Sequence, residues 1–293
     1  MDQTGIIGIM RTLTKWLVGI SAVVVLSGCA AITGLQNEFV FPNSAEGPMA
    51  RPVPVGAVQH WVTAKDGSKV EGWLFLPEGA SASNQVPAVM FFHGNSDYIE
   101  TKLEYPQYYT QRGIACLMVE YRGYRRSTGT PSEAAFAEDA DAFFDFLASR
   151  PEINKGQIGA HGHSMGAAIA VGLATRKPIR TLVMVSAFKS MPSMLGRYMV
   201  PSFLARERFD NMAAVQAYHG PILILHGEKD EIVPVSHARE LAKRGGNKVR
   251  LVITSPDDHD VPWNWETFGK TLDDFYAANE MTRGANNVEE RIP

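Results

Sequence analysis

A serine between two glycines is the pattern in this chain that points most directly to chemistry. Residues 162–166 read Gly-His-Ser-Met-Gly, which fits the G-x-S-x-G pattern of a nucleophile elbow, with Ser164 at its centre. In such an elbow a strand turns sharply into a helix, and the serine is held in a strained conformation with its hydroxyl exposed. The two glycines leave room where a Cβ would collide with neighbouring backbone. The pattern therefore predicts a nucleophilic Ser164, if a strand precedes it and a helix follows.

A serine hydroxyl becomes a good nucleophile when a base takes its proton, so a histidine and a carboxylate are expected nearby. The apolar run 222–225 leads into a loop that contains Asp230, and the run 251–253 leads into a loop that contains His259. The chain order is then Ser, Asp, His. We expect His259 to act as the general base and Asp230 to fix the tautomer of the imidazole.

Other roles for these residues are weighed against this triad. Asp230 could be a surface acid in the charged loop 228–231. His219, His226 and His237 are rivals to His259, but His226 belongs to a His-Gly pair at a strand end and His237 to a surface helix. A metal site in residues 257–260 is disfavoured, because four neighbouring ligands in one loop rarely close a coordination shell. We expect neither a metal nor another cofactor.

The tetrahedral intermediate of such a reaction needs N–H donors for its oxyanion. The backbone N–H of Met165, the residue after the nucleophile, is one predicted donor. The backbone N–H of Asn95 is the other, because Asn95 follows the first strongly apolar run, 87–92. His93, at the end of that run, is expected to hold the loop through hydrogen bonds.

The elements that must position these residues alternate between apolar runs and helix-like stretches. Runs at 58–64 and 70–76 flank Asp66-Gly67, a dipeptide typical of a hairpin turn. The later runs are continuously apolar, as is typical of parallel strands covered by helices on both faces. We therefore predict an α/β fold with a mostly parallel central sheet and the site at the carboxyl ends of its strands. The later strands are expected at 87–92, 114–119, 157–160, 179–185, 222–225 and 249–253, and helices at 162–176, 235–244 and 263–278.

A further helix is expected to start at a capping box. Residues 130–133 read Thr-Pro-Ser-Glu, which places Thr130 at the N-cap and Pro131 at the first helical position. The apolar residues that follow have the spacing of one helix face. They are Phe136, Ala140, Phe143, Phe144 and Leu147.

Together these motifs resemble the α/β-hydrolase superfamily over residues 57–280. The chain is most similar to its ABHD-type members and to bacterial lipoprotein relatives. The matching positions are His93-Gly94-Asn95, Gly123-Tyr124, Ser127, Gly129, Pro131-Ser132-Glu133, the elbow, His226-Gly227, Asp230 and Val233-Pro234. Arg125 stands where that group has a second glycine in its G-Y-G loop, and Asp258 stands where it has a glycine before the histidine.

The resemblance implies an α/β-hydrolase fold with a small cap insert. It also implies a serine hydrolase that cleaves a carboxylic ester or thioester through an acyl-Ser164 intermediate. Two alternatives remain open: an amidase or peptidase with the same triad, and a non-catalytic binding lipoprotein that uses the same fold.

The cap insert is expected at about 188–217, where the chain is longer than a single-helix crossover needs. Its methionines and aromatic residues suit a pocket for flexible acyl chains, so the substrate is expected to be a small or lipid-like acyl compound. Under this hypothesis Met194 and Phe203 face the acyl group. The alternative is that the insert packs on the sheet edge.

The N-terminus has the layout of an export signal. Arg11 and Lys15 precede an apolar run at 16–27, which is shorter than a membrane-spanning helix, and Leu-Ser-Gly-Cys follows at 26–29. This sequence resembles a lipobox, which predicts cleavage after residue 28 and lipidation of Cys29. The alternative is an ordinary signal that contains a cysteine, and Met10 could be the true start. Residues 29–56 would form a tether and 281–293 a C-terminal tail. The lipid anchor predicts an exported, membrane-attached lipoprotein, which would lie on the outer membrane or the periplasmic face if the cell is Gram-negative.

Composition excludes several other classes of protein. The chain has 293 residues with 28 basic and 31 acidic side chains, a net charge of −3, so a nucleic-acid partner is not expected. Hydrophobic residues make up 45%, which is enough for a substantial core. The two cysteines allow no disulfide framework, and Cys116 lies in an apolar run as a small buried residue.

Overall fold

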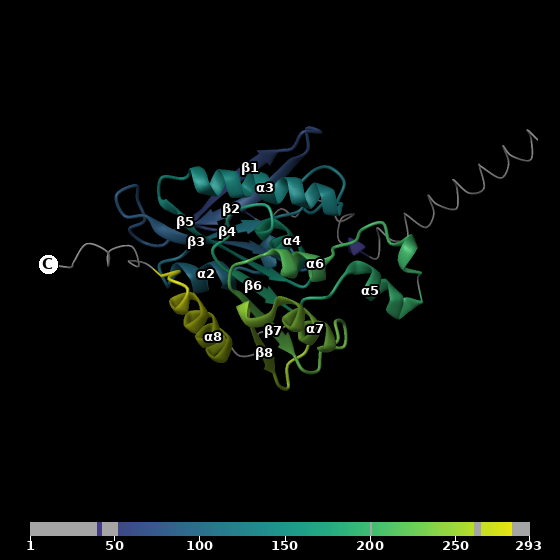
Figure 1. Ribbon diagram of the computed structural model, residues 1–293. Coiled ribbons are helices and arrows are strands. Elements are labelled where there is room, and N and C mark those ends of the chain that lie inside the picture. Colours follow the sequence, from purple (N-terminus) through teal and green to yellow (C-terminus); the bar gives the residue numbers. More distant parts are fainter. Residues whose placement is uncertain (1–39, 43–51, 200, 261–264, 283–293) are drawn as a thin grey trace, which may run out of the picture. The chain divides into compact units, whose positions relative to one another are not determined.

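A computed structural model describes residues 40–42, 52–199, 201–260 and 265–282. The chain divides into two units, residues 1–42 and 43–293, and the second carries the fold (Figure 1). Within the described residues, no helix is long and apolar enough to cross a membrane.

The second unit is built on an eight-stranded sheet in the order β1-β2-β4-β3-β5-β6-β7-β8. The hairpin β1–β2 is antiparallel and β2 also pairs antiparallel with β4, whereas all later neighbours are parallel. The predicted mostly parallel sheet is therefore confirmed. The strands are β1 (Ala57–Thr63), β2 (Lys69–Phe75), β3 (Val86–Phe92), β4 (Ala115–Val119), β5 (Ile153–His163), β6 (Leu182–Val185), β7 (Ile222–Gly227) and β8 (Val249–Thr254).

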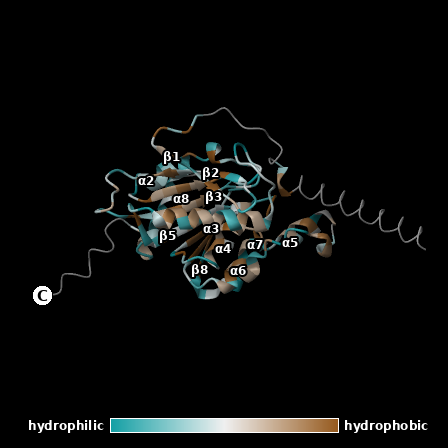
Figure 2. Ribbon diagram, turned by 90° about the horizontal axis from the view of Figure 1, so that it is seen from above, coloured by the Kyte–Doolittle hydropathy of each residue, from teal (hydrophilic) through white to brown (hydrophobic). Residues whose placement is uncertain are grey.

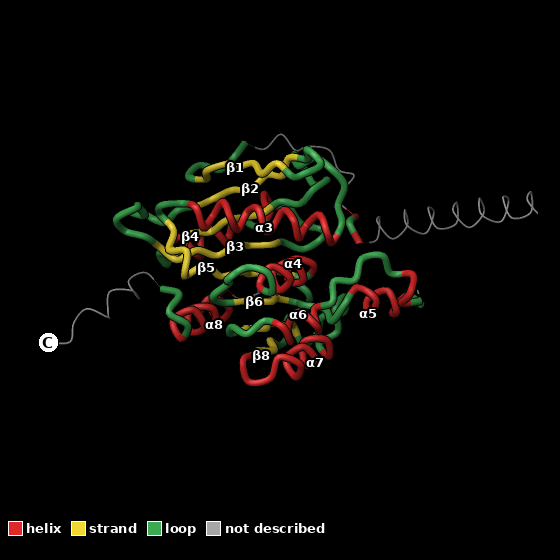
Figure 3. Tube along the Cα trace, turned by 45° about the horizontal axis from the view of Figure 1, so that its top comes forward, coloured by secondary structure: helices red, strands yellow, loops and turns green. Residues whose placement is uncertain are grey.

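Helices cover both faces of this sheet (Figure 3). On one face α3, α4, α6 and α7 pack against each other in turn. On the other, α2 and α8 share a core with alternate residues of the strands, among them Val89 and Phe91 of β3. Figure 2 shows how strongly hydrophobic the strands between them are. The helices are α2 (Glu104–Thr110), α3 (Glu133–Ser149), α4 (Met165–Ala174), α5 (Met191–Leu195), α6 (Asn211–Ala217), α7 (Ser236–Gly245) and α8 (Trp265–Ala278).

Several element boundaries differ from the sequence-based prediction, most clearly those of one helix and two strands. Helix α3 begins after Ser132, whose side chain accepts the Ala135 N–H, so the predicted N-cap at Thr130 is wrong. The preceding loop stays extended because it is bonded to β2: the Thr128 N–H donates to the Lys69 carbonyl at 2.8 Å. Strand β5 is longer than expected and β6 is shorter. The predicted apolar face of α3 is buried.

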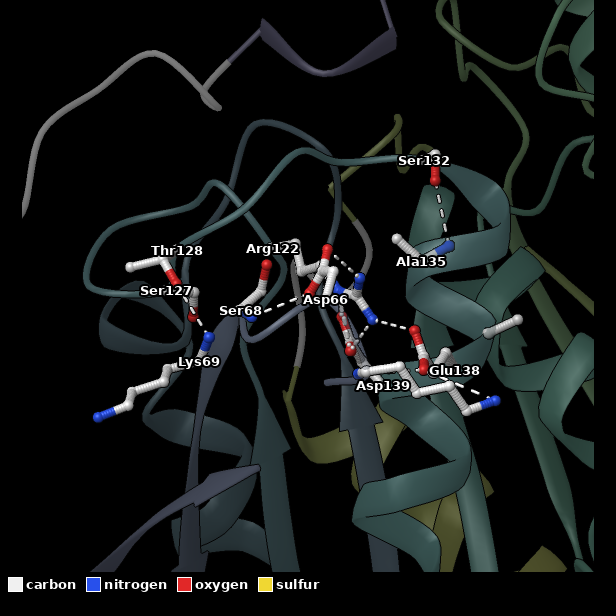
Figure 4. Close-up of polar contacts among 12 residues, drawn as sticks. Asp66, Ser68, Lys69, Arg122, Ser127, Thr128, Ser132, Ala135, Glu138 and Asp139 are labelled. Atoms are coloured by element: carbon white, nitrogen blue, oxygen red, sulfur yellow. Dashed lines mark hydrogen bonds and ion pairs between the residues drawn. The ribbon is translucent and has the colours of Figure 1, made fainter. Parts of the chain in front are cut away.

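Arg122 joins the hairpin to α3 (Figure 4). Its guanidinium makes a bidentate pair with Asp139, with Nε 2.8 Å from Oδ2 and Nη2 2.7 Å from Oδ1. It also lies 2.5 Å from Glu138 and 3.1 Å from Asp66 of the β1–β2 turn. Gly129 lies beside this turn at φ +90°, where a Cβ would come within 2.3 Å of Ser68 Oγ. These ion pairs and the packing of Gly129 on Ser68 hold the loop between β4 and α3 against the β1–β2 turn.

The connection between β6 and β7 contains the predicted insert. It comprises α5, two short 3₁₀ helices η3 (Gly196–Tyr198) and η4 (Ser202–Leu204), and then α6. Helix α6 packs against α4 and α7, whereas α5 packs mainly on η3 and η4. Figure 1 shows α5 set off to the side of the sheet. The insert is therefore a small feature beside one layer of helices.

Candidate active site

The turn from β5 into α4 has the backbone of a nucleophile elbow. Ser164 adopts φ 53° and ψ −115°, a conformation that L-residues rarely adopt. A Cβ on Gly162 would lie 2.1 Å from the Gly166 carbonyl oxygen, and one on Gly166 would lie 2.0 Å from the Phe92 carbonyl oxygen. The expected strain, and the expected need for both glycines, are confirmed.

The structure brings the three predicted site residues together. His259 Nε2 lies 3.0 Å from Ser164 Oγ, and His259 Nδ1 lies 2.9 Å from Asp230 Oδ2. Ser164 follows β5, Asp230 follows β7 and His259 follows β8. The imidazole therefore bridges a hydroxyl and a carboxylate, which is the arrangement a serine nucleophile needs.

Asp230 is buried, and both of its carboxylate oxygens accept hydrogen bonds, so it is not a surface acid. Its Oδ1 accepts the backbone N–H groups of Ile232 at 3.0 Å and Val233 at 2.7 Å. Its Oδ2 lies 2.9 Å from His259 Nδ1 and 3.2 Å from His226 Nε2. Burial alone would raise the pKa of Asp230, but the hydrogen bonds from His226 and His259 outweigh it and hold the pKa well below 3.8. The group is therefore a carboxylate at neutral pH.

The three rival histidines have other hydrogen-bond partners or lie away from Ser164. His226 is fully buried, and its Nε2 lies 2.7 Å from the Val233 carbonyl oxygen. His237 accepts the Lys189 backbone N–H, and burial, together with Lys189, lowers the pKa of His237 to about 4. His219 is exposed in the turn after α6. None of the three has a hydrogen bond to Ser164 among those made by the described residues.

The two predicted oxyanion donors lie in adjoining segments. Met165 is the first residue of α4, and the first N–H groups of a helix have no partner within it. Asn95 follows β3, and its carbonyl accepts the Tyr124 hydroxyl at 3.1 Å. His93, which is fully buried, holds this loop as expected, with Nδ1 2.8 Å from the Gly94 oxygen and Nε2 2.8 Å from Glu120. The close approach of Gly166 to Phe92 places the two segments side by side.

Comparison with known proteins agrees with this fold. A family described as serine aminopeptidase, S33, matches residues 83–209. The α/β-hydrolase domain-containing protein WAV2 of Arabidopsis thaliana is 26% identical over 247 residues, covering 74% of this chain and 78% of that protein. The chain belongs to the α/β-hydrolase superfamily. The uncharacterized protein Rv2307c of Mycobacterium tuberculosis is 29% identical over 251 residues, covering 84% of this chain and 88% of that protein.

Solved esterases share the α/β-hydrolase fold of this chain. The Pyrococcus furiosus esterase Pf2001 superimposes with a TM-score of 0.66 at 18% identity, covering 80% of this chain and 96% of that one. The Thermogutta terrifontis esterase Est2, with propionate bound, superimposes with a TM-score of 0.66 at 16% identity, covering 79% and 97%. The match to the hydrolase family and the superfamily support a hydrolase, and these neighbours support the fold.

Two polar residues of this α/β-hydrolase contact the site without having been singled out from the sequence. His163 Nε2 lies 3.0 Å from the His259 carbonyl oxygen, and Ser186 Oγ donates to the same oxygen at 2.8 Å. Asp97 lies behind His163, with Oδ2 3.6 Å from Nδ1. Burial would raise the pKa of Asp97, but His163 and Lys102 hold it well below 3.8. The sequence places His163 inside the elbow and Ser186 directly after β6, but neither position indicates which atom the side chain contacts.

Both departures from the group's motif have a structural explanation. Arg125 adopts φ 51°, the left-handed conformation that a glycine favours, and its guanidinium lies 3.2 Å from the centroid of the Tyr98 ring. A side chain that stacks in this way can offset part of the backbone strain. The side chain of Asp258 serves the turn after it: its Oδ1 accepts the Asp260 N–H at 3.0 Å.

The two predicted cap residues lie in different environments. Met194 of α5 is buried, whereas Phe203 of η4 is 81% exposed. Cys29 lies outside the described residues, and Cys116 is buried in β4. Among the described residues, His, Cys, Asp and Glu side chains form no group of three or more that could hold a metal ion.

Proposed function

We propose that this α/β-hydrolase is a serine hydrolase that cleaves a carboxylic ester or thioester through an acyl-Ser164 intermediate. The observation that carries the proposal is the pair of contacts made by His259, 3.0 Å to Ser164 Oγ and 2.9 Å to Asp230 Oδ2. These contacts connect a hydroxyl, an imidazole and a buried carboxylate in the order that activates a serine.

Each step follows from the chemistry of these groups. His259 Nε2 takes the Ser164 proton as Oγ bonds to the carbonyl carbon, and Asp230 stabilises the imidazolium that results. The N–H groups of Met165 and Asn95 are proposed to stabilise the oxyanion. The C–O or C–S bond then breaks, and the leaving group takes the proton from His259. Water deprotonated by His259 attacks the acyl-enzyme, which releases the acid and restores Ser164.

A fluorophosphonate probe tests the nucleophile, because it labels only an activated serine. We expect wild-type protein to be labelled and Ser164→Ala to be unlabelled. Ser149→Ala is the matched control, since Ser149 is exposed at the end of α3, and it should label as wild type does. Labelling of Ser164→Ala at the wild-type rate would overturn the assignment of the nucleophile.

Amide hydrolysis is the second candidate, favoured by the match to the serine aminopeptidase family. The same triad can attack an amide, but the amine leaving group must receive a proton as the C–N bond breaks. A panel of p-nitrophenyl esters, acyl thioesters and aminoacyl p-nitroanilides separates the two. We expect the esters and thioesters to give the higher kcat/KM, and a preference for the anilides would make the protein an aminopeptidase.

We also propose that the chain is exported and anchored through a lipid on Cys29. Cys116, the other cysteine of the chain, is buried in β4, so its thiol is not accessible for lipid attachment. Membrane fractionation tests this proposal. Wild type should sediment with membranes and Cys29→Ala should not, with Cys116→Ala as the control. Equal fractionation of wild type and Cys29→Ala would refute the anchor.

A further inference from the structure

His259 must reach across the sheet to meet its partner. It follows β8, which lies at the end of the sheet that the described strands form and pairs with β7, whereas Ser164 follows β5. Neighbouring strands lie about 4.8 Å apart, so the three strand steps from β8 to β5 span roughly 14 Å. The loop after β8 therefore cannot place the imidazole through strand pairing alone. Other contacts must hold it over the ends of β6 and β7.

The backbone carbonyl of His259 receives two such contacts. Ser186 Oγ donates to it at 2.8 Å from the end of β6, and His163 Nε2 lies 3.0 Å from it at the end of β5. A carbonyl oxygen has two lone pairs and can only accept, so His163 must carry its proton on Nε2. Both donors are buried, which makes these bonds costly to lose.

Ser186 has an unfavourable backbone conformation. It adopts φ 50°, close to the 53° of Ser164, although neither residue is a glycine. Its N–H donates to the Leu225 carbonyl at 2.9 Å, so the strained residue is tied to the end of β7 while its side chain is directed at His259. Strain that is retained at the end of a strand and serves one side-chain contact is typical of functional sites.

We propose that Ser186 and His163 are positioning residues that clamp the backbone of His259. This inference rests on the proposed function, because it concerns how the base is kept within reach of Ser164. The ring of His259 is oriented by Asp230, and the clamp fixes the peptide group from which that ring extends. Neither clamp residue has a role in bond making or breaking.

The test compares variants that lose a donor with variants that keep a donor or relieve the backbone strain. Ser186→Ala removes the hydroxyl, and Ser186→Gly removes it while also relieving the positive φ. His163→Leu removes the second donor, and His163→Gln keeps an N–H donor. Ser190→Ala is the matched control, because it removes a hydroxyl from the same connection that caps α5 instead.

With an ester substrate, we expect Ser186→Ala and Ser186→Gly each to lower kcat about tenfold with KM within about twofold, a loss of about 1.4 kcal/mol. His163→Leu should do the same, and His163→Gln should recover most of the loss. In the double variant, Ser186→Ala with His163→Leu, kcat should fall more than about 100-fold. Each single variant keeps one donor to the His259 carbonyl, whereas the double variant keeps neither. Titration of the active serine normalises kcat to folded enzyme.

Proton NMR provides a readout that does not depend on turnover. The Nδ1–H of His259, shared with Asp230, should give a low-field resonance that persists in the single variants and broadens in the double variant. Wild-type kcat and an unchanged resonance in the double variant would overturn the clamp. Wild-type kcat in Ser186→Gly, with a lowered kcat in Ser186→Ala, would also overturn it, because backbone strain would then be the cause of the loss. Failure of wild type to react with the fluorophosphonate would instead overturn the proposed function, and the resonance would still test the clamp.

Discussion

Replacement of Asp230 by asparagine separates the tautomer of His259 from the shape of the site. The carboxylate has two different edges: Oδ1 accepts two backbone N–H groups, from Ile232 and Val233, and Oδ2 faces His259 Nδ1. Asparagine is nearly isosteric, but one of its edges donates and the other accepts. It can therefore satisfy only one side of this site in either orientation.

The two orientations have different costs. With the amide oxygen toward Ile232 and Val233, the amide NH₂ donates to His259 Nδ1 and moves the ring proton to Nε2, so the ring can no longer accept the serine proton. The expected loss is about 10⁴ in kcat, or roughly 5.4 kcal/mol. With the amide reversed, activity is kept but both N–H groups lose their acceptor, at about 1–3 kcal/mol for the buried one of Val233 and less for that of the more exposed Ile232. The NH₂ edge also faces His226 Nε2 in the first orientation, but His226 keeps the Val233 carbonyl as an acceptor.

We expect the first orientation, because His259 can change tautomer whereas a backbone N–H cannot. Asp230→Asn should therefore lose about 10⁴ in kcat on an ester substrate with a Tm close to that of wild type. Asp210→Asn is the matched control: Asp210 caps α6 at the surface, and asparagine is an equally good N-cap. An Asp230→Asn variant that keeps most of its kcat but melts several degrees lower would show that the amide is reversed and would refute this reasoning.

Three further predictions concern the scaffold. Gly166→Ala should abolish folded, probe-reactive protein, because its Cβ would lie 2.0 Å from a backbone oxygen of β3, whereas Gly172→Ala in the same helix meets only the tip of an arginine at 3.3 Å and should raise Tm slightly. Asp139→Asn breaks a buried ion pair and should lower the free energy of unfolding by about 3–5 kcal/mol in urea titrations, and a loss no larger than that of the more exposed Asp141→Asn would contradict this. Burial lowers the pKa of His161 to about 3 from 6.5, so the unfolded chain binds a proton between these values and the folded one does not. Wild type should thus lose on the order of 3 kcal/mol of stability from pH 7 to pH 4 through this group, and urea titrations of His161→Phe should show a smaller fall with pH.

Much of the fold could be predicted from the sequence because its strands are buried on both faces. A strand such as β3, with every residue buried, reads as an uninterrupted apolar run, and its parallel pairing follows. The hairpin turn and the elbow are also local signals, set by glycines within a few residues. The start of α3 was missed because it depends on a distant partner. The loop before Ser132 is bonded to β2, so the capping sequence at Thr130 does not determine where the helix begins.

The predicted triad and the clamp differ in what the sequence can reveal. Ser164, Asp230 and His259 each follow a recognisable strand and have side chains of the required chemistry, so chain order and strand ends were enough to group them. The contact of Ser186 depends on the order of strands in space, since β6 lies between β5 and β7 only after the sheet has formed. The acceptor is moreover a backbone carbonyl, which every residue has, so no residue type marks its position. Residues that act on the main chain of a catalytic group therefore become visible only once the sheet order and the loop above it are known.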